Sequence, residues 1–465
     1  MSVDLIPTGQ LEIPHPRRRL PLLGDVIGVN PRTPVQDSMR YAAELGPIFE
    51  RKVLGTRFVI VSDPDIVAEL GDESRFRKHL APAVAALRGI AGDGLFTAYT
   101  EEPNWRRGHE LLMPAFTKSA MRSYHETMVD VAGELTRHWD RRIETGARVD
   151  VSSDMTKLTL ETIGRTGFSY SFDSFERDRP HPFVEAMVRA LSHAQLMASP
   201  VGRLPMARRN SRHEADVAYL AEVVDAVIRS RRDSAETASE DLLELMLRAE
   251  RENSPNRVDE LNIRHQVITF LVAGHETTSG ALSFALYYLS RHPEVLAEAQ
   301  AEVDAVWGPE RDHRPSYEQI AKLRYVRRVL DESLRLWPTA PAYAREAVHD
   351  TTLLGSHRLR AGDWMLVLIP ALHRNPVWGT DPDRFDPDRF LSEQVRTRPA
   401  HVYKPFGTGE RACIGRQFAL HEAVLVLGTL LHRYHIAGDP NYRLRVQERL
   451  TLMPTRFDVT LTRRN

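Results

Sequence analysis

The sequence predicts a mainly α-helical α+β fold with small β-sheets. Apolar residues recur at helical spacing over long segments, whereas strand-like patterns are confined to short runs. The chain has 465 residues, 42% of them hydrophobic, which is enough for one large core, and we find no internal repeat. We therefore expect an irregular, proline-containing lead-in over residues 1–31 and a single domain over residues 32–465.

The elements follow in order from these patterns. Two strands are expected around Gly55, which is a hairpin signal, and four glycines within residues 71–96 predict a loop region there. Helical patterns cover residues 34–45, 102–116, 121–144, 158–167, 182–197, 214–231, 259–291 and 415–432, and a further helix ends at residue 336. Strand-like runs cover residues 48–53, 57–62, 352–354, 364–369 and 451–461.

Composition excludes several classes of protein. The net charge is −1 and the pI is about 7.1, which does not suit a nucleic-acid-binding protein. A single cysteine cannot form an intramolecular disulfide, and this fits a reducing compartment. Residues 1–19 lack the apolar core of a signal peptide, and no stretch reaches the roughly 18 apolar residues of a membrane span. We expect a cytoplasmic protein without a membrane anchor.

The single cysteine, Cys413, lies in a glycine-rich stretch, residues 404–415, that leads into an apolar helix. A lone cysteine is often only a small buried hydrophobic residue. At a helix start, however, the helix dipole and free N–H groups are expected to lower the thiol pKa and favour the thiolate that binds metal. One thiolate is too few ligands for a zinc or iron–sulfur site. It is sufficient for a haem iron, because the porphyrin supplies four further bonds.

The same stretch also fits a loose dinucleotide-binding fingerprint over residues 407–412. That motif requires a preceding strand and an acidic residue about 20 positions further on. Pro405 and Phe406 come directly before it, and the helix that follows is nearly all apolar. We therefore reject the dinucleotide interpretation.

The helix expected over residues 259–291 is apolar at both ends and polar in its middle, at residues 273–278. Glycine, histidine, glutamate and two threonines are unfavourable in a buried helix interior. A water-filled kink is one explanation, and a functional site is the other. A zinc-protease motif at His275 is excluded, because Ser279 stands where the second histidine is required.

Glu332 and Arg335 are three residues apart on the helix that ends at residue 336. Taken alone they would be a surface ion pair worth a few tenths of a kcal/mol. Arg389 follows in the stretch 385–390 and is the candidate third member of a buried charge group.

These motifs together resemble one family. The haem-ligand signature of the cytochrome P-450 superfamily is matched at every fixed position by Phe406, Gly407, Gly409, Arg411, Cys413 and Gly415. The segments 273–280, 334–342 and 417–423 are similar to the haem domains of self-sufficient bacterial fatty-acid hydroxylases. The resemblance runs from about residue 35 to 460. It implies the P-450 fold, with haem b between the long central helix and the cysteine-loop helix, and a monooxygenase that uses O2 and NAD(P)H-derived electrons.

The resemblance also implies roles around the haem. Cys413 would be the proximal iron ligand, and Phe406 would either tune the iron or simply pack in the core. The haem propionates would be bound by Arg411, Trp105, His109 and, as a weaker candidate, Lys78. Glu276 and Thr277 would deliver protons to dioxygen. The substrate pocket would be lined by Phe96, Ala273, Ala340 and Leu452, and the structural triad would be Glu332, Arg335 and Arg389.

Two differences from those enzymes set the expected substrate and partner. The sequence shows no fused reductase, so electrons are expected from a separate ferredoxin, flavodoxin or flavin reductase. Arg106, Arg107, Lys404 and Arg416 would make a positive docking face, unless they are ordinary solvated charges. Where the fatty-acid enzymes hold the substrate carboxylate with arginine and tyrosine, this chain has Thr56 and Ile60, with Arg57 as a possible substitute.

We therefore expect a monomeric enzyme that inserts one oxygen atom into a C–H or C=C bond of a hydrophobic small molecule, a secondary metabolite. Three alternatives stay open at this point. They are a fatty-acid hydroxylase, a peroxygenase or isomerase on the same fold, and a haem sensor or carrier without turnover.

Overall fold

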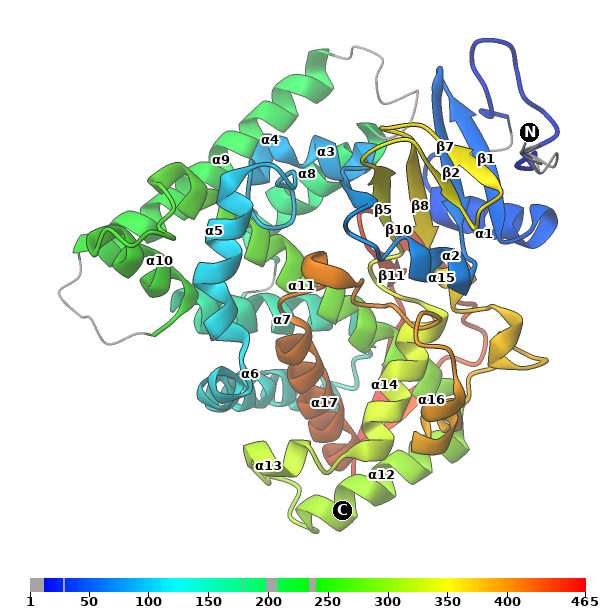
Figure 1. Ribbon diagram of the computed structural model, residues 1–465. Coiled ribbons are helices and arrows are strands. Elements are labelled where there is room, and N and C mark those ends of the chain that lie inside the picture. Colours follow the sequence, from blue (N-terminus) through cyan, green and yellow to red (C-terminus); the bar gives the residue numbers. More distant parts are fainter. Residues whose placement is uncertain (1–11, 28–29, 178, 198–206, 234–239) are drawn as a thin grey trace, which may run out of the picture. The chain divides into compact units, whose positions relative to one another are not determined.

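The computed structural model describes residues 12–27, 30–177, 179–197, 207–233 and 240–465 (Figure 1). The chain divides into two compact units. The first comprises residues 1–81, 341–383 and 397–412, and the second comprises residues 82–340, 384–396 and 413–465. The predicted class, mainly helical with small sheets, is confirmed. A single domain over residues 32–465 stays a prediction.

The first unit is built on a five-stranded sheet with the order β1-β2-β8-β5-β3. Only β2 and β8 run parallel. β1 and β2 are joined by Leu54 and Gly55, whose φ angles are 48° and 83°. Two consecutive residues with positive φ make the tight turn that matches the twist of a hairpin, as Gly55 indicates from sequence. The strand bounds are β1 Ile48–Val53, β2 Thr56–Val61, β3 Phe76–His79, β5 Ala342–Ala347 and β8 Trp364–Leu368.

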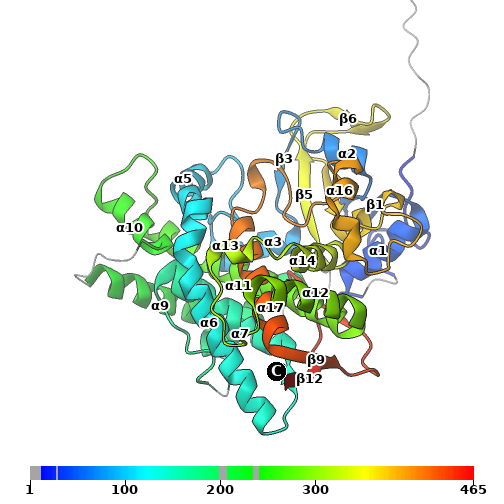
Figure 2. The ribbon, with the colours of Figure 1, turned by 90° about the horizontal axis from the view of Figure 1, so that it is seen from below.

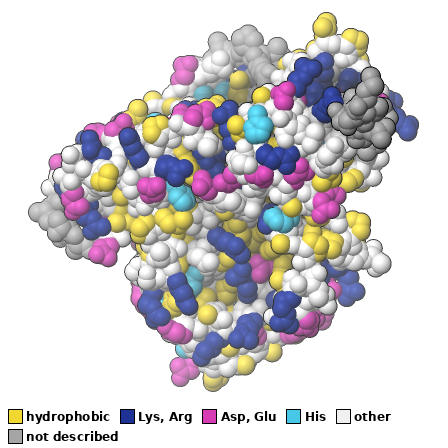
Figure 3. Space-filling view, viewed as in Figure 1, with side chains coloured by type: hydrophobic (Ala, Val, Ile, Leu, Met, Phe, Trp, Pro, Cys, Tyr) yellow, Lys and Arg dark blue, Asp and Glu magenta, His cyan; other side chains and the backbone are white. Residues whose placement is uncertain are grey.

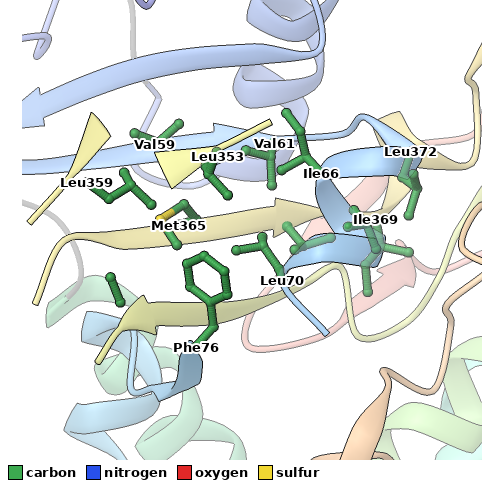
Figure 4. Packing of buried hydrophobic residues seen from close by; sticks show 13 residues of the cluster. Val59, Val61, Ile66, Leu70, Phe76, Leu353, Leu359, Met365, Ile369 and Leu372 are labelled. Atoms are coloured by element: carbon green, nitrogen blue, oxygen red, sulfur yellow. The ribbon is translucent and has the colours of Figure 1, made fainter. Parts of the chain in front are cut away.

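Alternate residues of β2 face opposite sides of this sheet, as the strand period of two requires. Ile60 packs with Phe49, Leu368 and apolar residues of α1 (Pro34–Leu45). Val59 and Val61 pack on the other side, in the apolar cluster that Figure 4 shows. That side is covered by residues of α2 (Pro64–Glu69), β6 (Thr351–Leu353), β7 (His357–Leu359) and α15 (Ile369–Leu372).

The second unit is organised around α11 (Glu260–Arg291). The Asp259 side chain caps its first turn by accepting a hydrogen bond from the Asn262 N–H, and Pro293 follows its end. Most of α11 is buried, because α7 (Val151–Phe168), α14 (Arg324–Leu336) and α17 (Arg416–Arg433) all contact it. Figure 2 shows α11 and α17 beside α6 and α7.

The other elements of the second unit surround this group or join its members. The helices are α3 Pro82–Ala86, α4 Arg88–Ala91, α5 Pro103–Leu112, α6 Lys118–Glu144, α8 Pro182–Met197, α9 Ala207–Asp233, α10 Leu242–Arg251, α12 Pro293–Trp307 and α13 Tyr317–Ile320. β4 Val149–Asp150, β12 Asp458–Arg463 and β9 Tyr434–Gly438 form one sheet, and β10 Val446–Glu448 and β11 Leu452–Pro454 form a hairpin.

The predicted ends of helices agree best with the observed ends where a proline or a capping residue marks them. The expected helices 34–45 and 182–197 match α1 and α8 at both ends. The predicted loop over residues 71–96 is wrong, because it contains β3, α3 and α4. The single strand expected over residues 451–461 is also wrong, because β11 and β12 are separate there. α10 and α12 were not predicted, although Asp241 caps the first and Pro293 begins the second.

On the face that Figure 3 shows, basic and acidic side chains are interspersed. Within the ranges that the structure describes, no helix combines the length and the apolar character that crossing a membrane requires.

Candidate active site

Cys413 lies between a short 3₁₀ turn, Gly409–Arg411, and the first turn of α17. The residue is exposed, although enough protein surrounds its sulfur to desolvate the thiol. Desolvation by the surrounding protein raises the pKa of the Cys413 thiol, while the Gly415 N–H and the Arg416 charge lower it less. The expectation of a lowered thiol pKa is therefore wrong for the chain by itself. Since a metal ligand must lose its proton, binding a metal would release that proton.

The loop before the cysteine is held by the first unit's sheet. Gly409 has φ 69°, and a Cβ at this position would lie 2.3 Å from a Glu73 carboxyl oxygen. Glu73 accepts a hydrogen bond from the Glu410 N–H at 3.1 Å and pairs with buried Arg345 at 3.6 Å. Only glycine fits this close approach in this backbone conformation. Sequence reasoning missed Glu73 and Arg345, which stabilise the loop from positions far away along the chain.

A second contact fixes the loop start. The Lys404 N–H donates to His373 Nε2 at 2.9 Å, and the His373 ring is fully buried. Phe406 and Arg411 are half-buried. Phe406, Arg411 and Lys78 all belong to the first unit, whereas Cys413 belongs to the second. Their predicted roles beside the iron and the haem propionates stay predictions.

One face of α11 is open although the helix is otherwise buried. Ala273 is exposed and Thr277, one turn further on, is half-buried. Thr277 Oγ1 donates to the Ala273 carbonyl oxygen at 2.7 Å. The helix is continuous through this stretch, so the polar residues are accommodated without a break in the helix. His275 is fully buried and bonds the Leu271 carbonyl oxygen at 2.7 Å, and burial lowers the pKa of His275.

Glu276 lies on a different side of α11 from Thr277. Its side chain is buried, and its carboxylate accepts a hydrogen bond from Thr451 Oγ1 at 2.8 Å. Arg449 Nη1 pairs with the other carboxylate oxygen at 3.2 Å. Both partners lie in the turn of the β10–β11 hairpin. The structure therefore places the predicted acid next to the hairpin, and its role as a proton donor stays a prediction.

Three of the four predicted pocket residues are exposed within the second unit: Phe96, Ala273 and Ala340. Leu452 is fully buried. Its N–H donates to the carbonyl oxygen of Thr339 at 2.9 Å, which places β11 next to the segment that carries Ala340. The loop that carries Phe96 packs on α11, where the Leu95 N–H donates to Gln266 Oε1 at 3.1 Å. That all four line one substrate pocket stays a prediction.

Trp105 and His109 lie one turn apart on α5, with their rings stacked at 5.4 Å between centroids. Trp105 is buried, and Arg106 lies over its ring. The structure thus brings these two residues together, and their haem-binding role stays a prediction.

Glu332, Arg335 and Arg389 meet in the second unit. Arg335 binds both Glu332 carboxylate oxygens, at 2.6 and 2.7 Å, and both side chains are fully buried. Arg389 Nε lies 3.6 Å from Glu332, which also accepts the Asp386 N–H at 2.9 Å. Desolvation raises the pKa of Glu332, and the Arg335 contact opposes this rise. Glu332 and Arg335 therefore form a fully buried, bidentate ion pair, and not the surface ion pair that their spacing alone would suggest.

A different buried carboxyl group lies on α17. Neither carboxyl oxygen of Glu422 makes a well-formed hydrogen bond within the part of the chain that the structure describes. The neighbouring Thr162 hydroxyl donates to the Leu158 carbonyl oxygen. Desolvation raises the pKa of Glu422 from 4.5 to about 8.

This shift predicts a pH-dependent stability. Between pH 4.5 and about 8 the unfolded carboxyl group is ionised, whereas the folded one keeps its proton, so stability falls as the pH rises. Glu422→Gln should match wild type near pH 4 and be more stable at pH 8, by on the order of 3 to 5 kcal/mol. Urea unfolding across this pH range checks it, with exposed Glu110→Gln as the control. If the free energy of unfolding depends on pH in the same way in wild type and Glu422→Gln, the prediction is contradicted.

The donor set fits a haem iron. Among the residues that the structure describes, no group of three or more histidine, cysteine or acidic side chains is placed to hold a metal ion. A single exposed cysteine at a helix start suits a metal whose other ligands come from a macrocycle.

Comparison with known proteins decides the family. The family model "Cytochrome P450" matches residues 14–461. The chain belongs to the cytochrome P450 family. The expected membership of the cytochrome P450 family is therefore confirmed, and with it the P450 fold.

The relatives of this P450 are longer proteins. It is 45% identical to the bifunctional cytochrome P450/NADPH–P450 reductase of Bacillus cereus, over 97% of this chain and 42% of the relative. It is 44% identical to bifunctional cytochrome P450/NADPH–P450 reductase 1 of Bacillus subtilis, with the same coverage. It is 37% identical to a self-sufficient cytochrome P450 monooxygenase of Phanerodontia chrysosporium, over 95% of this chain and 42% of the relative. The chain thus spans about two fifths of the length of these relatives.

Proposed function

We propose that this P450 inserts one oxygen atom of O2 into a C–H or C=C bond of a hydrophobic small molecule, using haem b held by Cys413. The observation that carries the proposal is the single exposed cysteine at the start of α17, in a chain whose family model covers residues 14–461. Bound haem supplies dioxygen activation, which a thiolate ligand favours by donating electron density to the iron. Proton delivery and substrate binding are the proposed roles of side chains of this chain.

Thr277 and Glu276 are the proposed proton relay. The Thr277 hydroxyl faces the open side of α11, where it can hold a water molecule. A carboxyl group at Glu276 can donate a proton to that water and take another from solvent, which is general acid catalysis by a positioned group. The Ala273 carbonyl oxygen accepts a hydrogen bond from the Thr277 hydroxyl group, and this bond orients the hydroxyl oxygen.

Thr277→Ala tests the relay. We expect product per NADPH consumed to fall and hydrogen peroxide to rise, because protons no longer arrive through a positioned hydroxyl. Thr277→Ser, which keeps the hydroxyl, is the matched control and should retain most of the coupling. The measurement compares NADPH, product and peroxide in one reaction. Unchanged coupling in Thr277→Ala would remove this residue from the relay.

The substrate we propose is neutral and hydrophobic, a secondary metabolite rather than a fatty acid. Ile60 is 1% exposed in the core between β2 and α1, so it offers no polar group. Arg57, the possible substitute anchor, already pairs with Glu50 at 2.5 Å and lies 3.6 Å from Asp363. A carboxylate beside Arg57 would compete with two acidic side chains for one guanidinium group.

Ligand titrations test this substrate class. We expect methyl dodecanoate to shift the haem Soret band at lower concentration than dodecanoate does, because Arg57, the cation next to Thr56 in the chain, is already paired with Glu50. Arg57→Gln should leave the dodecanoate affinity unchanged. Tight binding of dodecanoate that is lost in Arg57→Gln would instead assign the chain as a fatty-acid hydroxylase.

The proposed electron source is a ferredoxin, a flavodoxin or a flavin reductase that carries NAD(P)H-derived electrons. Arg106 and Arg107 are exposed on α5, and Arg416 is exposed at the start of α17, near Cys413 in the chain. Their positive charge suits an acidic redox protein. A cytoplasmic location and a monomeric state are part of the same proposal.

The decisive experiment for the activity uses isotopically labelled O2. The haem-loaded protein, a surrogate redox system and a panel of neutral hydrophobic compounds should give products that carry one labelled oxygen atom. Product formed with peroxide alone would favour the peroxygenase. Haem binding without NADPH consumption or product across the panel would favour a sensor or carrier.

A further inference from the structure

The loop over residues 92–98 is tied to two helices through one side chain, Asp93. Its carboxylate accepts hydrogen bonds from Asn104 Nδ2 of α5 at 2.7 Å and from Asn262 Nδ2 of α11 at 2.8 Å. His265, also on α11, donates from Nδ1 at 2.8 Å, and its side chain is 16% exposed. Burial raises the pKa of Asp93, but these hydrogen bonds outweigh it and lower the pKa below its ordinary value. The group is therefore an ionised acceptor for all three donors.

The backbone of this loop also approaches α11 closely. Gly92 has φ 45°, and a Cβ there would lie 2.0 Å from the His265 ring. A Cβ at Gly94 would lie 2.8 Å from the His265 carbonyl oxygen, so a side chain at either glycine would displace the ring or the helix. The Leu95 N–H donates to Gln266 Oε1 at 3.1 Å. The His265 imidazole therefore meets the loop in two ways, because its nitrogen binds the carboxylate and its ring packs against Gly92.

The second half of the loop is fixed to α4. Thr97 and Ala98 are both 0% exposed. Thr97 Oγ1 donates to the Ala91 carbonyl oxygen at 3.2 Å, and Arg88 Nη1 donates to the Thr97 carbonyl oxygen at 2.8 Å. Phe96 lies between the two fixed halves and is 38% exposed. The loop thus presents one large apolar ring from a backbone that is held on both sides.

Given the proposed monooxygenase function, we propose that Asp93 and His265 determine which carbon of the substrate is oxidised, by fixing the orientation of Phe96. A neutral hydrophobic substrate has no charged group to fix its orientation, so the shape of the apolar surface that it meets decides which carbon is presented. Phe96 is a predicted part of that surface, and the bond between Asp93 and His265 holds its loop. The two residues act through the loop, so they are positioning residues.

Two substitutions separate the ring of His265 from its hydrogen bond. His265→Phe keeps an aromatic ring against Gly92 and loses the donor, whereas His265→Asn keeps an N–H donor near the Nδ1 position. Asp93→Ala removes the acceptor. The probe is methyl dodecanoate, whose many similar CH2 groups make the ratio of hydroxylated positions a measure of orientation. We expect His265→Phe and Asp93→Ala to change that ratio by about threefold or more, and His265→Asn to keep the wild-type ratio.

Phe96→Ala tests whether the pair acts through the aromatic ring. It should change the ratio by itself, and adding His265→Phe to it should change nothing further. A further change would mean that the pair acts elsewhere, and this would overturn the inference. His292→Phe is the matched control, because His292 lies at the other end of α11, 3.4 Å from Glu294. This variant should keep the wild-type ratio.

Hydrogen exchange of the amides over residues 92–98, measured without substrate, is the second readout. Exchange should be faster in His265→Phe and Asp93→Ala, and it should be unchanged in His265→Asn and His292→Phe. A wild-type ratio of products in both His265→Phe and Asp93→Ala, with or without faster exchange, overturns the inference. If wild type oxidises neither methyl dodecanoate nor any compound of the panel, the monooxygenase proposal fails instead, and hydrogen exchange alone decides whether the pair fixes the loop.

Discussion

Arg335→Leu should lower the free energy of unfolding by about 3 to 5 kcal/mol, because it leaves the Glu332 carboxylate buried without its bidentate partner. Both side chains are fully buried, and the two hydrogen bonds between them measure 2.6 and 2.7 Å. Arg389 at 3.6 Å and the Asp386 N–H are the remaining partners and cannot replace a two-pronged guanidinium contact. Guanidinium chloride unfolding followed by circular dichroism measures the loss.

Two variants serve as controls for this prediction. Arg335→Lys keeps the charge but loses the planar fork, so an intermediate loss of stability is expected. Glu318→Gln removes the exposed ion pair with Arg122, and the free energy of unfolding should stay close to that of wild type, because solvent screens an exposed pair. An Arg335→Leu protein as stable as Glu318→Gln would show that the buried pair contributes nothing to the fold.

Cys413→His should abolish monooxygenase turnover while the protein keeps its fold. An imidazole can bind haem iron, but it donates less electron density than a thiolate and favours O–O cleavage less. We expect product formation from NADPH and O2 to fall by at least about a hundredfold, which corresponds to about 3 kcal/mol or more of lost transition-state stabilisation. Haem content by absorbance and product by mass spectrometry are measured on the same sample.

The control for Cys413→His is a measurement of its thermal stability. Cys413 lies before α17 begins, and its exposed side chain is not part of the apolar core. The thermal unfolding midpoint without haem should therefore be close to that of wild type. Turnover retained in Cys413→His would mean that a different residue holds the iron.

Local signals predicted those parts of the fold that are defined locally. Pro34 and Pro182 begin α1 and α8, and the expected ranges match both helices. β3 was missed because its existence depends on pairing with β5, where Phe76 opposes Ala347 from far along the chain. α7 begins at Val151, seven residues before the predicted start, because the Asp150 side chain caps a turn that apolar periodicity does not reveal.

The candidate site also combines features that are local in sequence with features that depend on distant residues. The motif around Cys413 is continuous in sequence and could be identified there, as could Glu332 and Arg335 on one helix. The partners of Glu276 could not, because Arg449 and Thr451 are 173 and 175 residues away in the chain. The direction of the shift in the Cys413 thiol pKa was also predicted wrongly. Desolvation raises this pKa, and its size depends on how the surrounding protein packs, which the position at a helix start does not reveal.

The most direct test of the account is the absorption spectrum of the dithionite-reduced, carbon-monoxide-bound form of the haem-loaded wild-type protein. Ligation by the Cys413 thiolate predicts a Soret band at the long-wavelength position characteristic of thiolate-bound haem. A band at the shorter wavelength of imidazole-bound haem, or a protein that stays colourless after haem supplementation, would contradict it.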